Sequence, residues 1–220
     1  MYLHKEETLN RAEIEKLQLE RLQQTVKHCM NSTFYKKRFE ENGLTPDDIQ
    51  SLYDLKKIPF TTKQDLRDNY PFGIASVPLD KAVRLHSSSG TTGNPTVIIH
   101  TQKDLDEWAN AVARCLHMVG LRPGDVFQNS SGYGMFTGGL GIQAGIEALG
   151  AMSIPAAAGN SRRQIKCITD YGTTAIHAIP SYALRLADVF DELGIDPAKD
   201  TNLTTFLIGA EPHTEETRRK

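Results

Sequence analysis

The part of the sequence richest in potential chemistry is a short run of hydroxyl and glycine residues. Five hydroxyl side chains and two glycines stand within the seven residues 87–93. Glycine tolerates the backbone turns that point successive N–H groups inward, and hydroxyl groups add uncharged donors. This composition predicts an anion-binding loop that wraps a polyphosphate. The residues that we expect to bind it are Ser88, Ser89, Gly90, Thr91, Thr92 and Gly93.

The alternative for this loop is an ordinary surface turn, since Ser, Thr, Gly, Asn and Pro cluster in turns generally. Against it, apolar runs flank the loop at residues 82–85 and 97–99, as expected for two strands joined by a specially built connection. A P-loop of the G-x-x-x-x-G-K-[ST] type is excluded, because no lysine follows either glycine at the required spacing. His86 borders the loop and either approaches a bound nucleotide or has a structural role, which is the commoner case.

A second candidate site lies in a glycine-rich segment, residues 132–145. Aromatic residues beside glycines are typical of a flat apolar slot, because glycine lets a ring approach the backbone closely. The residues that we assign to such an acyl-binding slot are Tyr133, Phe136, Gly138 and Gly139. In the alternative interpretation, Phe136 belongs to the core and the glycines permit close helix packing. The glycines also imitate a dinucleotide fingerprint, but the last interval is one residue too long, so we discount a Rossmann cofactor site.

The elements that position these loops begin with helices. Residues 9–30 repeat apolar positions at the spacing of an amphipathic helix, and a second helix is expected over residues 33–41. A third helix is expected to begin at Thr45, where a capping residue precedes a first-turn proline and two acidic residues. We therefore assign residues 1–80 to an N-terminal helical segment.

Strands and helices alternate in the remainder, residues 81–220. The expected strands after the loop are residues 126–129, 151–154, 173–178 and 204–208, and the expected helices are residues 101–119, 162–171, 181–193 and one that ends at residue 149. Repeated strand-helix-strand units predict an α/β fold, a mainly parallel sheet with helices on both faces. We assign this segment to a nucleotide- and acyl-binding portion.

Ligands of open parallel sheets bind beyond the carboxyl ends of the strands. The segments after Asn129, Ala178 and Ile208 occupy such positions, and we expect them to converge on one cleft. The residues that follow the last of these strands are Gly209, Ala210, Glu211 and Pro212. Taken alone, Glu211 is equally well explained as a solvated carboxylate.

Composition excludes several classes of function. With 39% hydrophobic and 24% charged residues the chain is ordinary for a globular protein, and a formal net charge of -2 gives no reason to expect nucleic acid. No apolar run is long enough to span a bilayer, and the first residues lack the apolar region of a secretory signal, so we expect a cytoplasmic protein. The three cysteines and seven histidines show no spacing suited to a metal site.

The motifs together carry a family resemblance. Residues 88–95, Ser-Ser-Gly-Thr-Thr-Gly-Asn-Pro, resemble the phosphate loop of the adenylate-forming enzymes, the superfamily of acyl-CoA synthetases, luciferases and peptide-synthetase adenylation domains. More narrowly, the chain is similar to the phenylacetate-CoA ligases. The segments that carry this narrower resemblance are residues 59–67, 133–141 and 209–212.

The resemblance implies ATP-dependent activation of an aryl-acetic acid such as phenylacetate, first to an acyl-adenylate and then to its coenzyme A thioester. It implies ATP with Mg²⁺ as a substrate complex and coenzyme A as the second substrate. Residues 88–93 would hold the phosphates, residues 209–212 would line the adenine and carboxylate region, and Asn94 stands where many relatives carry a lysine. Small molecules are the expected partners, without nucleic acid or membrane, and we allow for a homodimer.

The resemblance also implies that part of the active site lies outside this chain. Family members are longer and complete the site with an acidic motif near the magnesium ion and a mobile C-terminal domain that bears the catalytic lysine. We therefore expect an N-terminal fragment that is inactive by itself. Two alternatives stay open: a ligase that transfers the acyl group to a protein or carrier, and a non-catalytic module that binds a nucleotide or an acyl group.

Overall fold

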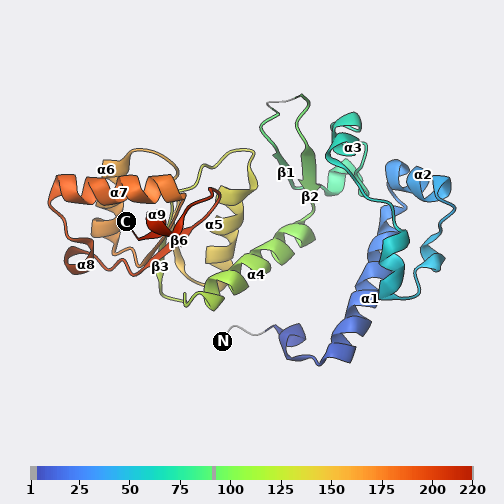
Figure 1. Cartoon of the computed structure of the whole chain (residues 1–220), viewed down its shortest axis with the longest axis horizontal. Helices are drawn as coiled ribbons and strands as arrows, with labels where there is room; N and C mark the ends of the chain where they lie inside the picture. The colour runs from blue at the N-terminus through green and yellow to red at the C-terminus, as the bar shows by residue number, and fades with distance from the viewer. Residues whose placement is uncertain (1–3, 91–92, 220) are drawn as a thin grey trace. The chain divides into compact units, whose positions relative to one another are not determined.

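The computed structural model describes residues 4–90 and 93–219. The chain divides into two compact units, residues 3–105 and a second unit that contains residues 106–220 (Figure 1). The sequence pattern changes earlier, after residue 80, where helices give way to alternating strands. The domain boundary expected after residue 80 stays a prediction, because a division into compact units describes how the chain packs and does not show which segment folds independently.

The first unit begins with helices. They are α1 (Arg11–Cys29), α2 (Thr33–Glu41) and α3 (Lys63–Asp68), and short 3-10 turns cover Lys5–Thr8, Pro46–Asp48, Leu52–Lys57 and Leu79–Lys81. A capping box starts α1: the Asn10 side chain accepts from the Glu13 N–H at 3.0 Å, and the Glu13 carboxylate accepts from the Asn10 N–H at 2.9 Å. The two helices expected at residues 9–30 and 33–41 are confirmed.

The prediction of a third helix is wrong, because only the 3-10 turn Pro46–Asp48 forms directly after Thr45. The Asp54 carboxylate accepts the backbone N–H groups of Gln50 and Ser51 at 3.1 and 2.8 Å. Those two N–H groups would have to donate to preceding carbonyls if a helix continued. The capping box of Ser51 with Asp54 therefore ends the turn that the box of Thr45 with Asp48 begins, and it starts the next turn.

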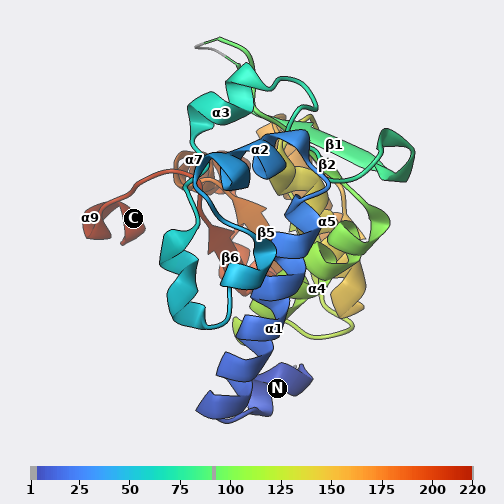
Figure 2. The same cartoon turned by 90° about the vertical axis from the view of Figure 1, so that its right-hand side faces the viewer.

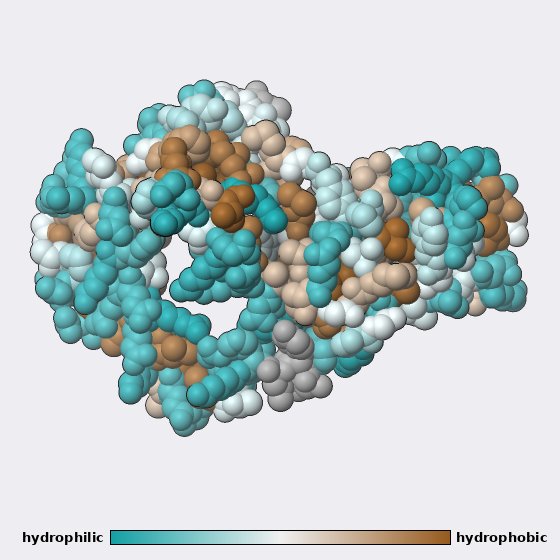
Figure 3. Space-filling model, turned by 180° about the vertical axis from the view of Figure 1, so that it is seen from behind, coloured by the Kyte–Doolittle hydropathy of each residue, from teal (hydrophilic) through white to brown (hydrophobic). Residues whose placement is uncertain are grey.

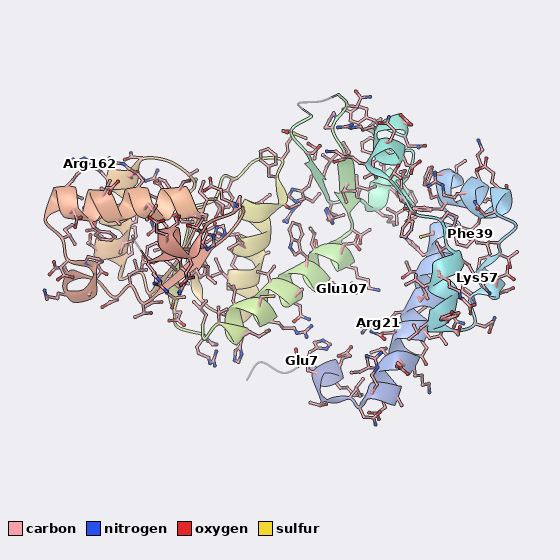
Figure 4. The ribbon with its side chains drawn as sticks, in the orientation of Figure 1. Glu7, Arg21, Phe39, Lys57, Glu107 and Arg162 are labelled. Atoms are coloured by element: carbon pink, nitrogen blue, oxygen red, sulfur yellow. The ribbon has the colours of Figure 1, made fainter. Side chains whose placement is uncertain are left out.

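The helices of this unit share a small apolar core. Val26 of α1, Phe39 of α2 and Ile49 are buried together, and α2 lies beside the C-terminal end of α1 (Figure 2). Figure 4 labels Phe39 on α2. The Arg38 guanidinium joins α2 to α3 through two hydrogen bonds to the Asp65 carboxylate, at 3.1 and 2.7 Å. This bidentate pair gives a structural role to the segment 59–67, whose function the sequence left open.

The first unit ends in a β-hairpin. Strands β1 (Arg84–Ser87) and β2 (Val97–His100) pair antiparallel, with Ser87 opposite Val97. The two strands expected on either side of the hydroxyl-rich loop are thus confirmed, although the first one lies two residues later than the apolar run suggested. Helix α4 (Gln102–Met118) follows at once.

The second unit contains a four-stranded sheet in the order β4-β3-β5-β6. Strands β3 and β6 of this sheet are labelled in Figure 1. Its strands are β3 (Val126–Asn129), β4 (Met152–Ile154), β5 (Ala175–Ala178) and β6 (Thr205–Ile208). All three pairings are parallel, which confirms the α/β fold expected from the alternation of strands and helices. The helices around the sheet are α5 (Thr137–Leu149), α6 (Ser161–Tyr171), α7 (Pro180–Leu193), α8 (Pro197–Asp200) and α9 (Glu215–Arg218).

Helices cover both faces of this sheet. Ala175 packs into a core with residues of α4 and α5, whereas the next residue, Ile176, packs into another core with residues of α6 and α7. Consecutive strand residues point to opposite faces, so the two helix pairs lie on opposite sides. At the surface, apolar residues occur in scattered groups among hydrophilic ones (Figure 3). Across residues 4–90 and 93–219, every helix is too short or too polar to cross a bilayer.

Candidate functional site

The hydroxyl-rich loop is closed at its base by Ser88. The Ser88 N–H donates to the Thr96 carbonyl at 3.0 Å, and the Ser88 hydroxyl accepts from the Thr96 N–H at 2.9 Å. The hydroxyl oxygen of Ser88 therefore anchors the loop, and its hydrogen is still able to donate to a ligand. Ser89 is exposed at the following position.

Gly90 makes the turn of the loop. Its φ is +67°, and a Cβ built on it would lie 3.2 Å from the Gly93 carbonyl oxygen. The left-handed backbone and the crowding both exclude a larger side chain without strain. Gly93 and Asn94 are exposed, and the Gly93 N–H donates to the Gly90 carbonyl at 3.2 Å. The expected phosphate contacts of Thr91 and Thr92 lie outside the described residues.

A pair of histidines lies on the hairpin beneath this loop. His86 of β1 is buried, and its ring centroid lies 5.5 Å from that of His100 on β2, in an edge-to-face arrangement. Burial lowers the pKa of His100, as do the neighbouring His86 and Arg84, while the nearby Asp104 carboxylate opposes the shift. The burial of His86 favours the structural role among the two that the sequence left open.

In the second unit, Tyr133 is an anchor of the loop that follows β3. Its hydroxyl accepts from the Asn129 side chain at 2.9 Å and donates to the Gln143 side chain at 2.8 Å. Gln143 also accepts from the Ser153 hydroxyl at 2.7 Å. Burial raises the pKa of Tyr133, and the hydrogen bond to Asn129 partly opposes it. The phenol therefore stays protonated at neutral pH and holds the loop through both of its hydrogen-bonding roles.

Phe136, Gly138 and Gly139 differ in what surrounds them. Phe136 is 58% exposed, so the alternative that placed it in the core is wrong. A Cβ on Gly138 would meet nothing within 4 Å, whereas a Cβ on Gly139 would lie 2.4 Å from the Gly132 carbonyl oxygen. Gly139 thus permits close packing of the loop backbone at Gly132 against the first turn of α5, whereas the alternative had placed such packing between the helix and the sheet. The space beside the Gly138 backbone is open, and the Phe136 side chain is exposed two residues before it.

Two buried or half-buried residues of the sheet, Asn129 and His177, were missed in the sequence. The Asn129 side chain donates to the Gly139 carbonyl at 2.8 Å, and it accepts from the Ser131 N–H at 3.2 Å. His177 of β5 lies beside it, with Nδ1 2.7 Å from the Ser131 hydroxyl oxygen. Burial lowers the pKa of His177, so its ring is neutral at pH 7. A polar residue in the last two positions of a buried strand was the signal that marked both positions.

The segment after β6 lies beside the segment after β5. The Gly209 N–H donates to the Ala178 carbonyl at 3.4 Å, and the Glu211 carboxylate accepts from both the backbone N–H and the hydroxyl of Ser181, each at 3.0 Å. The simpler interpretation, in which Glu211 is only a solvated carboxylate, is therefore wrong. Two contacts bear on the expected convergence: Ser131, which follows β3, contacts His177 within β5, and Glu211, which follows β6, contacts Ser181, which follows β5. That all three segments form one cleft stays a prediction.

The described residues offer no cluster of three His, Cys, Asp or Glu side chains that could hold a metal ion. Apart from the Glu211 carboxylate, which accepts from Ser181, the polar groups at the predicted sites are hydroxyls, amides and backbone N–H groups. These groups suit anions and neutral oxygens and give little of the charge that a hard cation such as Mg²⁺ prefers.

The sequence is closely related to three bacterial ligases, although no protein-family model matches it. It is 50% identical over 203 residues to the phenylacetate-coenzyme A ligase of Pseudomonas putida, a match that covers 92% of this chain and 46% of that protein. Identity to the phenylacetate-coenzyme A ligase of Aromatoleum evansii is 47%, over 96% of this chain and 48% of that protein. Identity to the phenylacetate-coenzyme A ligase of Escherichia coli (strain K12) is 46%, over 97% of this chain and 49% of that protein.

The fold is also that of a solved ligase. A crystal structure of 2-hydroxyisobutyryl-CoA ligase, in complex with 2-HIB-AMP and CoA, superposes with a TM-score of 0.86 at 33% identity, over 93% of this chain and 45% of that chain. The chain thus spans about half the length of the relatives and of the structure that it matches.

Proposed function

Because this chain belongs to the phenylacetate-CoA ligase family and corresponds to an N-terminal part of its members, we propose that it carries the phosphate loop and acyl pocket of an ATP-dependent ligase. The acid would be an aryl-acetic acid such as phenylacetate, and the product its coenzyme A thioester. The observation that carries the proposal is 44–50% identity to four phenylacetate-CoA ligases over 92–100% of this chain.

The proposed reaction has two steps. A carboxylate oxygen of the acid attacks the α-phosphorus of ATP, an O–P bond forms, and the bond to the bridging oxygen breaks to release pyrophosphate. The thiol of coenzyme A then attacks the acyl carbonyl, loses its proton and displaces AMP. Both steps depend mainly on positioning and on neutralising charge, which a loop of N–H and hydroxyl donors supplies.

The residues that we propose for the nucleotide are those of the loop between β1 and β2, with Gly90 at the turn. The left-handed φ of Gly90 supports this role, because a residue in that conformation is typical of the backbone turns that bind anions. Tyr133 would position the acyl pocket, and Phe136 would form a wall of it beside Gly138. The exposure of Phe136 and the open space at Gly138 support that assignment.

Mg²⁺ would enter with ATP as part of the substrate. Apart from Glu211, whose carboxylate accepts from Ser181, the described residues near the predicted sites are uncharged donors, which fit phosphate oxygens better than the ion itself. The role of this chain is therefore to bind and orient the phosphate and acyl groups. We further propose a cytoplasmic location and a homodimer, which cell fractionation and size-exclusion chromatography would test.

The test uses the full-length ligase that contains this chain. We expect pyrophosphate release with ATP to be fastest with phenylacetate in a panel of aromatic and aliphatic acids, and thioester to form on coenzyme A. Thioester formed only on a carrier protein would show that the acceptor is a protein instead. Calorimetry on the 220-residue chain with ATP and with phenylacetate measures binding directly. Binding without turnover in the full-length protein would indicate a non-catalytic module.

A further inference from the structure

The first turn of α7 has one N–H group that no backbone carbonyl satisfies. Helix α7 begins after Ile179, whose apolar side chain is unable to cap it, and Pro180 has no N–H. The N–H groups of Tyr182 and Ala183 donate to the Ile179 carbonyl at 3.0 and 2.9 Å. Only the N–H of Ser181 in this turn must find its acceptor elsewhere in the fold.

That acceptor is Glu211, which follows β6 in the chain. One carboxylate oxygen accepts from the Ser181 N–H at 3.0 Å, and the other accepts from the Ser181 hydroxyl at 3.0 Å. A carboxylate at a helix N-terminus is further favoured by the helix dipole. Glu211 thus does for α7 what the side chain of Ile179 is unable to do.

The backbone next to Glu211 is in an unusual conformation. Ala210 has φ +69°, in the left-handed region. This conformation is unfavourable in free energy for any residue that has a Cβ. On one side of Ala210, the Gly209 N–H donates to the Ala178 carbonyl at 3.4 Å. On the other side, the carboxylate of Glu211 is fixed to Ser181. The strained residue is therefore held between two attachments, to the end of β5 and to the start of α7.

We propose that Glu211 is a positioning residue, which fixes the backbone of residues 209–212 against α7 and gives this segment the shape that binds the nucleotide. The proposal rests on the proposed function and refines it. Each oxygen of Glu211 accepts a hydrogen bond from Ser181, so the carboxylate is fixed within the protein, and in this proposal its charge serves that attachment instead of a contact to the ligand. The nucleotide would instead meet the backbone of Gly209 and Ala210.

Three variants of the full-length ligase separate positioning from charge. Glu211→Ala removes both bonds, and we expect the KM for ATP to rise about tenfold or more, with a smaller change in kcat, since a bond to a charged group is lost and binding is misaligned. Glu211→Gln keeps an oxygen for the N–H and an amide that donates to the hydroxyl, so the KM should stay within about threefold of wild type. Ser181→Ala in the Glu211→Ala background should add nothing further.

A control glutamate lies on the same helix. Glu192 of α7 accepts from Arg162, labelled in Figure 4, at 3.2 Å and from Arg185 at 2.8 Å, far from the first turn of the helix. Glu192→Ala removes a carboxylate from α7 and leaves its N-terminus intact. We expect the KM for ATP in this variant to equal that of wild type.

Amide hydrogen exchange at Ser181 in the 220-residue chain tests the contact without any activity. We expect faster exchange in Glu211→Ala, and exchange near that of wild type in Glu211→Gln and Glu192→Ala. Unchanged exchange in Glu211→Ala would overturn the proposal, because the carboxylate would not be the acceptor. A rise in KM as large in Glu211→Gln as in Glu211→Ala would also overturn it, because the charge itself would then bind the ligand.

The outcomes distinguish this proposal from the function on which it rests. An active wild type whose KM for ATP is unaltered by Glu211→Ala overturns the positioning role alone. A wild type that releases no pyrophosphate with any acid overturns the proposed function and the positioning role together. If Glu211→Ala does not fold, Glu211→Gln decides by itself, since the two roles predict different KM values for it.

Discussion

Two adjacent glycines at the start of α5 give a matched pair of variants. An alanine at Gly139 would place its Cβ 2.4 Å from the carbonyl oxygen and 3.1 Å from the carbonyl carbon of Gly132, both backbone atoms that are unable to rotate away. An alanine at Gly138 would meet nothing within 4 Å. The two substitutions make the same chemical change in the same turn, so they differ only in the space available.

We expect the two substitutions to change the free energy of unfolding in opposite directions. Alanine gains about 1 kcal/mol of helix propensity over glycine at either position. Overpacking against fixed backbone costs about 1–3 kcal/mol, so Gly139→Ala should lower the free energy of unfolding by up to about 2 kcal/mol. Loss of the Asn129 hydrogen bond to the Gly139 carbonyl would add about 1 kcal/mol to that cost. Gly138→Ala should raise the free energy of unfolding by about 1 kcal/mol.

Urea unfolding followed by tryptophan fluorescence measures this difference. Trp108 is the single tryptophan of the chain and lies in the unit that contains α5, so its signal reports that unit. We expect the Gly139→Ala midpoint to fall and the Gly138→Ala midpoint to rise. Equal midpoints for the two variants would refute the reasoning that the Gly132 backbone is fixed. In the full-length ligase, Gly138→Ala should raise the KM for phenylacetate without loss of stability, if the space at Gly138 holds the acid.

Three further predictions concern the loop and two titrating groups. Gly90→Val should abolish pyrophosphate release in the full-length ligase, because a β-branched side chain blocks the close approach of phosphate to the backbone, and its strain at φ +67° should lower the free energy of unfolding by only about 1–3 kcal/mol; unaltered release would contradict the phosphate-loop assignment. Arg38 holds the pKa of Asp65 well below its ordinary 3.8, so this stabilisation is complete above that value and is lost as the pH falls through the lower pKa of the folded chain. Arg38→Met should therefore make acid unfolding less steep, as circular dichroism at graded pH would measure, and equal steepness would count against the pair. Burial lowers the pKa of His177 below 6.5, so its contribution to the free energy of unfolding should be complete above pH 6.5 and be lost as the pH falls through the lower pKa of the folded chain. His177→Gln should therefore reduce the loss of stability at acid pH, as urea unfolding followed by Trp108 fluorescence would measure.

The sequence was sufficient to predict the elements whose signals are local. The amphipathic pattern of α1 and the alternation of strands and helices after residue 100 predicted the parallel sheet with helices on both faces, as observed. The prediction of a helix that begins at Thr45 was wrong, although its capping signal is equally local. The competing capping box of Ser51 and Asp54 was overlooked. Side-chain bonds to backbone N–H groups decide between a short turn and a helix there.

The candidate site was predictable only in part, because its contacts join residues far apart in the chain. The loop at Gly90 and the exposed Phe136 follow from residue type and spacing. The role of Gly139 depends on how closely the Gly132 backbone approaches it, and the partner of Glu211 lies 30 residues earlier, at Ser181. Neither distance is encoded in a local pattern, so the sequence could not give the bonds within these segments, and their role in ligand binding stays a prediction.

The most direct test of the account is a crystal structure of the full-length ligase with a non-hydrolysable ATP analogue. We predict that the triphosphate lies against residues 88–93, with phosphate oxygens within hydrogen-bond distance of backbone N–H and hydroxyl groups around Gly90. A triphosphate bound elsewhere, with this segment serving only to connect β1 and β2, would contradict the account.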